Sequence, residues 1–481
     1  MVDQSDVCLV GIGVCSGVTM DKHNWKGKRV LIIGAARQGL ALARFLCKHG
    51  AEVTLNDQRP ADQMAGAMQS LSEFPIHWVL GNHPVEIING IELICPSGGV
   101  PLDIPPVMEG VRSGIPLSND SQILLEEISC EVIGITGSAG KTTTTTLVGR
   151  MAKAACEPDR KVWIGGNIGT PLIDQVDQIT PDDLVVLELS SFQLEQMTIS
   201  PAIGAVLNIT PNHLDRHRTM QAYTAAKARI LAFQTENDTA VLGRDDPGSW
   251  GLRSMARGKL VSFGITPPPP GIIGTYFSNG NLWLTAQGKE THLMSQEKIR
   301  LRGSHNLLNV LAACAVAASA NFPPSAMVAG VEGFAGVAHR LEYIRTWKGA
   351  DWYNDSIATA PERTAAAIHS FDEPLVLLLG GRDKNLPWED LAALVKKRVD
   401  HLIVFGECAR IILEAVGNVS PEERPYTIER CSNLVSAVQA AARIAEPGDV
   451  VLLSPGGTSF DEFKDFAERG EKFREWVNKL S

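Results

Sequence analysis

Gly134-Ile-Thr-Gly-Ser-Ala-Gly-Lys-Thr-Thr143 decides how the middle of this 481-residue chain folds, because it joins the apolar run Val132–Ile135 to a glycine-rich loop and a lysine–threonine pair. Glycines in such a loop let successive backbone N–H groups converge on phosphate oxygens, and a following helix presents its positive end to them. Lys141 adds a cation, and Thr142 offers a hydroxyl to Mg²⁺. The stretch therefore predicts a strand, a phosphate-binding loop and the start of a helix.

This loop has the pattern T-G-x-x-G-K-T, which is shorter than the general nucleotide-binding pattern G-x-x-x-x-G-K-[ST], whose first glycine would fall on Ile135. A glycine-rich turn without a ligand is the competing interpretation, and the strand–loop–helix context disfavours it. The residues expected to hold nucleotide phosphates are Gly137, Ser138, Ala139, Gly140, Lys141, Thr142 and Thr143.

Length and composition restrict the class of protein. The chain exceeds one typical core, so we expect about two to four domains. A net charge of −10 argues against nucleic acid or an anionic membrane as the main partner. The nine cysteines form no C-x-x-C pair, which is typical of reduced thiols in a cytoplasmic protein. No apolar run approaches the roughly 20 residues that a membrane-spanning helix needs.

The N-terminal segment is apolar from Val7 to Val18, but the acidic residues Asp3 and Asp6 precede it where a signal peptide would carry basic ones. A signal peptide is therefore not expected. We expect residues 1–25 to form an extension that can be disordered.

A first α/β unit is predicted from the strand Lys28–Ile33, the turn Gly34–Gly39, a helix that runs to His49, and a strand that ends near Asp57. This order is typical of dinucleotide-binding domains, except that Ala36 replaces the second glycine. A redox cofactor is one interpretation of the turn, and a different nucleotide is another. A third strand, residues 92–94, leads into Ser97-Gly98-Gly99.

Two further α/β units follow along the chain, and strands that alternate with helices predict parallel sheets. In the second unit, strands are expected at 132–135, 185–189, 205–209 and 239–242, a hairpin at 276–283 and a helix at 306–320. In the third unit, strands are expected at 375–379, 402–405 and 450–453, each followed by a loop of glycine or small residues. Ligands of open parallel sheets bind at such carboxyl ends.

The predicted fold class is α/β with three domains: an N-terminal Rossmann-like domain, a central P-loop ATPase-type parallel sheet and a C-terminal Rossmann-like domain. The expected boundaries are 26–120, 121–336 and 337–481.

Several polar side chains stand where strands end, and these are the candidates for chemistry. Glu188 ends an apolar strand, and beside a phosphate-binding loop such an acid is the expected partner of Mg²⁺. A carboxylate satisfied by backbone donors is the alternative. His213 follows another strand and joins Thr142 and Glu188 as a candidate metal ligand. Lys227 lies on a predicted helix, where a lysine on the surface needs no explanation.

Motifs spread over the chain resemble those of the Mur ligases, from about residue 25 onward. The motifs in question are Thr136–Thr142, Gly165–Gly169, Glu188–Glu195, Asn208–His213, Ser304–Asn309, Leu453–Pro455 and Ser459–Phe463. Within this family the chain is most similar to the members that act on UDP-N-acetylmuramoyl-L-alanine and D-glutamate.

The resemblance implies a cytoplasmic, monomeric bacterial enzyme that uses ATP and Mg²⁺ to form an amide bond in peptidoglycan precursor synthesis, without nucleic acid or membrane partners. In that family the carboxylate of the UDP-substrate attacks the γ-phosphate of ATP, and an amine attacks the resulting acyl phosphate. Two Mg²⁺ sites are expected, with Thr142, Glu188, His213 and Lys227 as ligands, and Lys227 is expected to carry a carbamate derived from CO2. The implied catalytic residues are Lys141, Glu188, His213 and Lys227.

The same resemblance assigns binding residues. Those expected at ATP, besides the loop, are Asn309, Arg340 and Asp355. Those expected at the UDP-substrate are Arg37, Gln38, Asp57, Arg59, Gly99, Asn167, Ser190 and His213. Those expected at glutamate are Thr359, Lys384, Ser459, Phe460 and Phe466.

Two departures from the family pattern concern the amino-acid site. Ile357 stands where the common motif has lysine, which removes one cation near a dicarboxylate substrate, and Gly456-Gly457-Thr458 replaces Ala-Cys-Ala. Ligation of L-glutamate therefore stays open as an alternative. A nicotinamide-dependent oxidoreductase that uses Gly34–Gly39 is the alternative of another class, and it leaves the phosphate-binding loop without a purpose. A nucleotide-switched binding protein is the third.

Overall fold

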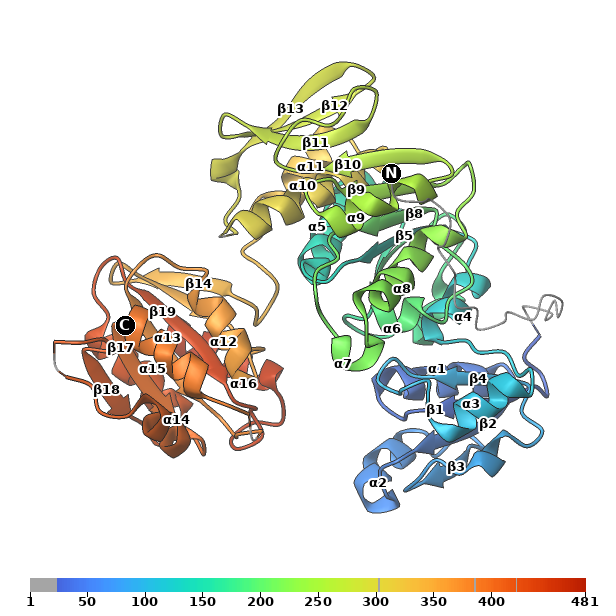
Figure 1. The fold of residues 1–481 in the computed structure, drawn as a ribbon, viewed down its shortest axis with the longest axis horizontal. Coiled ribbons are helices and arrows are strands. Elements are labelled where there is room, and N and C mark those ends of the chain that lie inside the picture. Colours follow the sequence, from blue (N-terminus) through green and yellow to red (C-terminus); the bar gives the residue numbers. More distant parts are fainter. Residues whose placement is uncertain (1–23, 302, 385, 421) are drawn as a thin grey trace, which may run out of the picture. The chain divides into compact units, whose positions relative to one another are not determined.

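The computed structural model describes residues 24–301, 303–384, 386–420 and 422–481 (Figure 1). Most of the expected N-terminal extension, residues 1–23, lies outside the described residues. Trp25, at its end, is packed: it is 5% exposed and its Nε1 donates a 2.8 Å hydrogen bond to Glu127. The described residues divide into two compact units, those of 24–294 with 308–330 and those of 295–307 with 331–481.

A four-stranded sheet lies at the start of the first unit, in the order β3-β2-β1-β4, and its strands pair in parallel. The predicted strands are confirmed, and β3 is an addition. The bounds are β1 Arg29–Ile33, β2 Glu52–Asp57, β3 His77–Leu80 and β4 Leu93–Pro96, with helices α1 Arg37–Lys48, α2 Ala61–Ser70 and α3 Pro105–Arg112 and the 3₁₀ helix η1 Val85–Ile88. Because β1 pairs with both β2 and β4, the loops that follow these three strands share one edge.

A nine-stranded sheet forms the rest of the first unit, in the order β13-β12-β11-β10-β9-β8-β5-β7-β6. Its strands are β5 Glu131–Thr136, β6 Val162–Gly166, β7 Leu184–Glu188, β8 Ile203–Val206, β9 Thr239–Gly243, β10 Lys259–Phe263, β11 Ile273–Ser278, β12 Asn281–Ala286 and β13 Lys289–Ser295. From β6 to β11 the pairing is parallel, as predicted.

Helices precede, connect and follow these strands. They are α4 Asp120–Glu127, α5 Lys141–Ala155, α6 Ser191–Leu194, α7 Leu214–His217, α8 Met220–Ala232, α9 Pro247–Gly251, α10 Ser304–Ser319 and α11 Pro324–Val331, with 3₁₀ helices η2 Leu172–Gln178, η3 Leu252–Met255 and η4 Gln296–Lys298. Helix α5 begins at Lys141, directly after the glycine-rich loop, which confirms the predicted strand–loop–helix order.

The predicted hairpin is also confirmed, because β11 and β12 pair antiparallel around Asn279 and Gly280. Both turn residues have positive φ, 49° and 74°. Such a pair forms the type I′ turn whose twist matches that of the flanking strands, and Asn-Gly is its preferred sequence.

The second unit contains a six-stranded sheet, orange to red in Figure 1, in the order β14-β15-β19-β16-β17-β18. Its strands are β14 Glu342–Trp347, β15 Ala350–Asn354, β16 Leu375–Gly380, β17 His401–Phe405, β18 Thr427–Arg430 and β19 Val450–Gly456. Only the pair β14–β15 is antiparallel among these described strands. The helices are α12 Pro361–Ile368, α13 Glu389–Arg398, α14 Ala409–Val416, α15 Leu434–Ile444 and α16 Phe466–Asn478.

Both faces of this sheet are covered, which explains why its strands are continuous apolar runs. All six residues of β16, Leu-Val-Leu-Leu-Leu-Gly, are buried. Leu377 and Leu379 belong to a cluster with α12, α13 and α14, whereas Val376 and Leu378 belong to a cluster with α15 and α16. Alternate residues of one strand thus serve two cores.

The described residues include no helix long and apolar enough to cross a membrane.

Trp352 on β15 tests the second of these cores, because its side chain is 0% exposed and its ring lies 6.2 Å from that of Phe473 on α16. We expect Trp352→Ala to lower the free energy of unfolding of this unit by about 3–5 kcal/mol, because it removes a large buried side chain and leaves a cavity. Urea titration of the full chain measures the change.

The control is Tyr426→Ala in the same unit, where the aromatic side chain is 46% exposed. It should change the free energy of unfolding by at most about 0.5 kcal/mol. Equal unfolding midpoints for the two variants would contradict the described packing.

Candidate functional site

The predicted phosphate-binding residues meet at one edge of the nine-stranded sheet, because β5 lies between β7 and β8. Ile135 pairs with Glu188, and Thr136 pairs with Val206. Since all three strands run in the same direction, the loops that follow them leave the sheet together. Gly166, at the end of β6, pairs with Glu188 and brings Asn167 to the same edge.

A neighbouring segment fixes the shape of the glycine-rich loop. The backbone N–H of Ala139 donates to Oδ1 of Asn208 at 2.8 Å, and the N–H of Ser138 donates to the carbonyl of Asn208 at 3.0 Å. The Ser138 hydroxyl in turn donates to the carbonyl of Thr210 at 2.9 Å. These protein contacts fix the conformation of the loop, so a ligand does not have to order it on binding.

Glu188 is 2% exposed, and both of its carboxylate oxygens accept hydrogen bonds. Oε2 accepts from the Thr142 hydroxyl at 2.7 Å, and Oε1 accepts from Nδ2 of Asn167 at 2.9 Å. Mg²⁺ binds oxygen at about 2.1 Å in octahedral geometry, so its neighbouring ligands lie about 3 Å apart. The Thr142 and Glu188 oxygens thus fit two adjacent positions of such an ion.

The other predicted metal ligands do not form a protein-only cage. Among the described residues, no three His, Cys, Asp or Glu side chains gather in a way that would hold a metal ion. His213 stands at the start of α7 with a left-handed backbone, φ 53°, and its ring packs edge-on against Phe192 at 5.0 Å. An ion bound at Glu188 would therefore need oxygens from its phosphate ligand.

Lys227 is 1% exposed, so the interpretation of it as a surface lysine is wrong. Its Nζ donates to the carbonyl of Gly137 at 2.9 Å, and Nζ of Lys141 donates to the same oxygen at 2.9 Å. Burial, together with the charge of Lys141, lowers the pKa of Lys227 to about 7. Two ammonium groups at one acceptor repel each other, and the buried one loses its proton more easily.

Asp57, predicted at the UDP-substrate, lies at the turn of the first sheet and contacts its backbone. Asp57 is 5% exposed and accepts from the N–H of Ala35 at 2.8 Å and from Arg59 at 2.7 Å. The hydrogen bonds from Arg59 lower the pKa of Asp57 to about 2. In this structure Asp57 therefore fixes the turn and orients Arg59, the more exposed partner.

The remaining residues predicted for the UDP-substrate lie around this turn and at the sheet edge beside Glu188. Arg37 and Gln38 begin α1, and Gly99 lies in the loop after β4. Ser190 caps α6: its hydroxyl accepts from the N–H of Gln193, and the Gln193 side chain accepts in return from the N–H of Ser190 at 3.0 Å.

In the second unit, Asp355 follows β15 and is 5% exposed. It accepts from the N–H of Leu341 at 3.2 Å and from the hydroxyl of Ser454 at 2.8 Å, and burial raises its pKa to about 7. The exposed Arg340 lies between His339 and Leu341, which have positive φ of 65° and 41°. The structure thus joins Asp355 to the backbone that carries Arg340.

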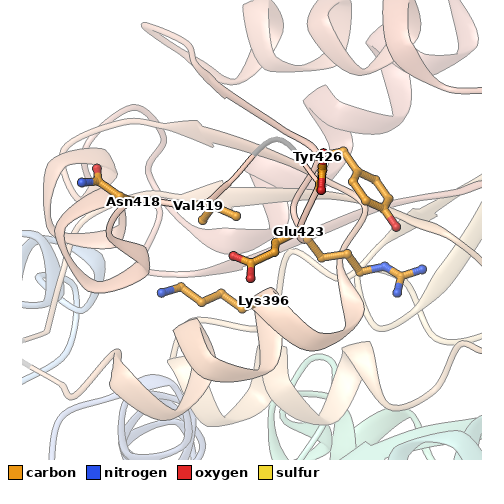
Figure 2. A pocket seen from close by; sticks show the side chains of 7 residues that line it. Lys396, Asn418, Val419, Glu423 and Tyr426 are labelled. Atoms are coloured by element: carbon orange, nitrogen blue, oxygen red, sulfur yellow. The ribbon is translucent and has the colours of Figure 1, made fainter.

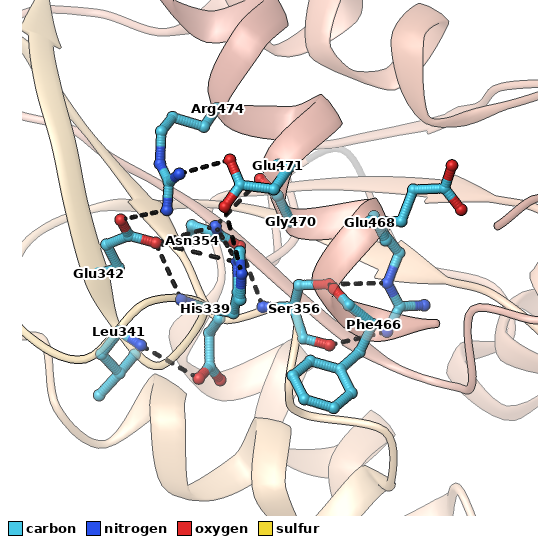
Figure 3. Close-up of polar contacts among 12 residues, drawn as sticks. His339, Leu341, Glu342, Asn354, Ser356, Phe466, Glu468, Gly470, Glu471 and Arg474 are labelled. Carbon is cyan, nitrogen blue, oxygen red and sulfur yellow. Dashed lines mark hydrogen bonds and ion pairs between the residues drawn. The ribbon is translucent and has the colours of Figure 1, made fainter. Parts of the chain in front are cut away.

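A polar network maintains this strained backbone (Figure 3). The N–H of His339 donates to Glu342 at 2.8 Å, and Nδ2 of the fully buried Asn354 donates to Glu342 at 3.1 Å and to the carbonyl of Gly470 at 3.2 Å. Arg474 binds Glu342 at 2.6 Å. Non-glycine residues with positive φ are uncommon, and surrounding contacts must compensate for their cost.

The predicted glutamate residues lie at the carboxyl ends of β15, β16 and β19, which are neighbours in the sheet. Lys384 donates to the Thr359 hydroxyl at 3.2 Å. Ser459 is 2% exposed, whereas the side chains of Phe460 and Phe466 are 60% and 37% exposed. The structure therefore leaves both aromatic rings accessible at this edge.

Arg469 is a cation that sequence reasoning missed, because it is one of several charged residues of α16 and nothing in the local sequence shows that it is the buried one. It is 0% exposed and donates to the carbonyl of Ser356 at 2.8 Å and to that of Gly457 at 3.1 Å. Ile357 follows directly, and its N–H donates to the carbonyl of His339 at 3.0 Å. Arg469 thus joins the two segments that depart from the family pattern.

A pocket of about 400 Å³ lies elsewhere in the second unit (Figure 2). It is lined by Lys396, Asn418, Val419, Glu422, Glu423, Arg424 and Tyr426. No residue predicted for a substrate, ATP or metal ion is among them, so this pocket is separate from the candidate site.

Comparison with known proteins assigns three stretches of the chain to one family. Residues 28–119 match the domain described as Mur ligase MurD-like, N-terminal domain. Residues 135–317 match the Mur ligase middle domain, and residues 339–457 match the Mur ligase, glutamate ligase domain.

Curated relatives match over nearly their full length. The UDP-N-acetylmuramoylalanine–D-glutamate ligase of Pelotomaculum thermopropionicum is 39% identical over 454 residues, 94% of this chain and 98% of the relative. The enzyme of that name from Symbiobacterium thermophilum is 39% identical over 457 residues, with the same coverage of 94% and 98%.

Solved structures agree on the fold. MurF of Acinetobacter baumannii has a TM-score of 0.56 at 17% identity and covers 93% of this chain and 94% of its own. UDP-N-acetylmuramate–alanine ligase MurC of Thermotoga maritima has a TM-score of 0.54 at 18% identity, with coverage of 94% and 99%. With three domain matches in order and relatives at 39% identity over 94% of the chain, the protein belongs to the Mur ligase family.

Proposed function

We propose that this protein joins D-glutamate to UDP-N-acetylmuramoyl-L-alanine at the expense of ATP, in the synthesis of peptidoglycan precursors. The curated relatives carry this activity in their names and match nearly the whole chain. The structural observation that carries the proposal is the meeting of the phosphate-binding loop, Glu188 and the buried Lys227 at one sheet edge. We place the reaction in the bacterial cytoplasm, where ATP is available.

The chemistry explains why a carboxylate substrate needs ATP. A carboxylate does not react with an amine, because its oxygen is a poor leaving group. When a carboxylate oxygen attacks the γ-phosphorus, the bond to ADP breaks and an acyl phosphate forms. The amine of glutamate then attacks the acyl carbon, the amide bond forms, and phosphate and a proton leave.

The residues of the sheet edge suit the first of these steps, in which negative charge spreads over the transferred phosphoryl group. Lys141 can leave the Gly137 carbonyl for a phosphate oxygen, since a lysine is a mobile cation. Mg²⁺, when bound, would neutralise further charge there, and Thr142 and Glu188 are the residues that would hold it. The metal-binding roles of His213 and Lys227 remain predictions.

Gly140 allows the glycine-rich loop to lie close to Asn309, a residue predicted to bind ATP. Gly140 precedes α5 with a φ of 82°, and a Cβ at its position would lie 2.1 Å from Oδ1 of Asn309. The predicted ATP residue Asn309 therefore contacts the loop, and only glycine permits that approach. The roles of Arg340 and Asp355 toward ATP are also part of the proposal.

Lys227 has the properties that a carbamylated lysine requires. Only a neutral amine attacks CO2, and the resulting carbamate carries a negative charge after release of one proton. A buried amine with a pKa of about 7 is largely neutral above that pH. The carbamate would also remove the repulsion between Lys227 and Lys141, and it would supply an anionic ligand for a second Mg²⁺.

The choice of glutamate enantiomer is the finer part of the proposal, and the alternative is L-glutamate. The measurement is phosphate release with product mass in reactions that contain ATP, Mg²⁺, the UDP-substrate and one enantiomer. We expect turnover only with D-glutamate. Product from L-glutamate alone would replace the proposed substrate, and phosphate release that ignores both substrates would refute the ligase.

Gly140→Ala should weaken binding of ATP by about tenfold or more, because the new methyl group collides with Asn309 and the backbone conformation is strained for alanine. Titration with a non-hydrolysed ATP analogue measures this. Gly66→Ala on α2 is the control, since no atom lies within 4 Å of its added Cβ. Equal affinities in both variants would exclude the described role of Gly140.

Lys227 should carry a carbamate whose amount, at fixed dissolved CO2, rises as the pH increases through about 7. The sign follows from the lowered pKa: below it the amine is protonated and unreactive. Nuclear magnetic resonance with ¹³C-bicarbonate detects the carbamate carbon.

Two lysine variants control this experiment. Lys227→Met should lose the signal, and Lys153→Met, at an exposed lysine of α5, should keep it. A signal that persists in Lys227→Met, or its absence from the unsubstituted protein at pH 8, would rule the modification out.

A further inference from the structure

Arg216 connects the segment after β8 to the loop after β4. The proposed reaction assigns no role to this residue. It lies in the short helix α7, next to His217. Its Nη1 donates to the carbonyl of Gly98 at 2.9 Å, and its Nη2 donates to the carbonyl of Val100 at 2.6 Å. One guanidinium group thus fixes two carbonyls of the loop after β4.

That loop packs on the turn of the first sheet. A Cβ at Gly34 would lie 2.9 Å from Cγ2 of Val100 and 3.0 Å from Cβ of Ser97, and the Ser97 hydroxyl donates to the Gly34 carbonyl at 2.9 Å. A Cβ at Gly39 would likewise lie 3.0 Å from Oγ of Ser97. Because there is no free space between the two segments, a shift of the loop would displace the turn Gly34–Gly39.

Arg216 is itself held in a fixed orientation. Its side chain is 15% exposed, its guanidinium carbon lies 4.4 Å from the centre of the Phe192 ring, and Nη2 lies 3.2 Å from Oε1 of Glu195. Phe192 also stacks on His217 at 5.2 Å. A planar guanidinium with two parallel donors and an aromatic face beneath it has geometry that lysine cannot reproduce.

Other contacts already join the first sheet to the rest of the unit. Arg44 binds Asp174 at 2.6 Å, and Trp25 donates to Glu127. Loss of Arg216 therefore leaves these ties in place, and its effect should be local to the loop after β4.

We propose that Arg216 is a positioning residue for the UDP-substrate: by fixing the Gly98 and Val100 carbonyls, it sets the loop and turn that contact the uridine diphosphate part. The identity of the ligand rests on the proposed function. The position of the loop does not.

Arg218 supplies a matched control. Arg218 lies two residues after Arg216 and binds Asp103, which also follows β4, at 2.8 Å, but the two side chains are 77% and 61% exposed. Such surface ion pairs contribute little. A variant at Arg218 therefore tests whether any lost cation in this region has the same effect.

The experiment measures binding of UDP-N-acetylmuramoyl-L-alanine by calorimetry to the unsubstituted full chain and to Arg216→Gln, Arg216→Lys and Arg218→Gln. We expect affinity to fall about 10- to 100-fold in Arg216→Gln, because a displaced loop misplaces its ligand. Arg216→Lys should recover only part of the loss, and Arg218→Gln should bind normally. In turnover, KM for the UDP-substrate should rise while KM for ATP stays unchanged.

A purely structural role would give a different result, namely equal losses of UDP-substrate and ATP binding, and that result would overturn the proposal. Unchanged UDP-substrate affinity in Arg216→Gln would also overturn it and would leave the proposed function intact. If the unsubstituted protein does not bind the UDP-substrate, both fail. If Arg216→Gln does not fold, Arg216→Lys decides alone, and binding equal to that of the unsubstituted protein is the contrary outcome.

Discussion

The parallel pairing of β5 with both β7 and β8 is the constraint on which the candidate site depends. Parallel strands end on the same edge of the sheet. The order of the strands is therefore enough to bring together the loop after β5, the acid at the end of β7 and the segment after β8. The nine-stranded sheet continues this arrangement to β6, whose following residue, Asn167, binds Glu188. The chemistry of the site is therefore a consequence of sheet order first and of residue choice second.

Residue choice then sets the charges. At this edge a buried carboxylate and two lysines lie close to one loop, and both lysines donate to the same carbonyl. An arrangement in which two cations donate to one acceptor is electrostatically unfavourable, and burial together with the charge of Lys141 lowers the pKa of Lys227. This repulsion is removed either when an anion such as phosphate binds near the lysines or when Lys227 loses its proton, as it does when it reacts with CO2. The positive charge of the two lysines thus favours the binding of anionic ligands at this edge.

Much of this could be predicted from the sequence, since it is encoded locally. The strand–loop–helix around Lys141, the Asn279-Gly280 hairpin and the apolar strands of the second unit each depend on neighbouring residues, and the structure confirms them. What the sequence did not reveal depends on packing between distant segments. Lys227 is buried because α8 packs beside β5 and β8, and Arg469 is buried because α16 packs beside β14 and β15. The residues of α8 and of α16 do not by themselves indicate that Lys227 and Arg469 are buried.

The network around His339 has a consequence for how the chain is made. Arg474 and the carbonyl of Gly470 support Glu342 and Asn354, and the pair Arg474–Glu342 spans 132 residues. A ribosome needs on the order of ten seconds to add that many residues. During this interval the strained backbone around Arg340 lacks the contacts that Gly470 and Arg474 provide, although the whole middle domain of the family has already been synthesised. Co-translational folding can therefore complete the phosphate-binding sheet well before it can complete the loop that carries Arg340.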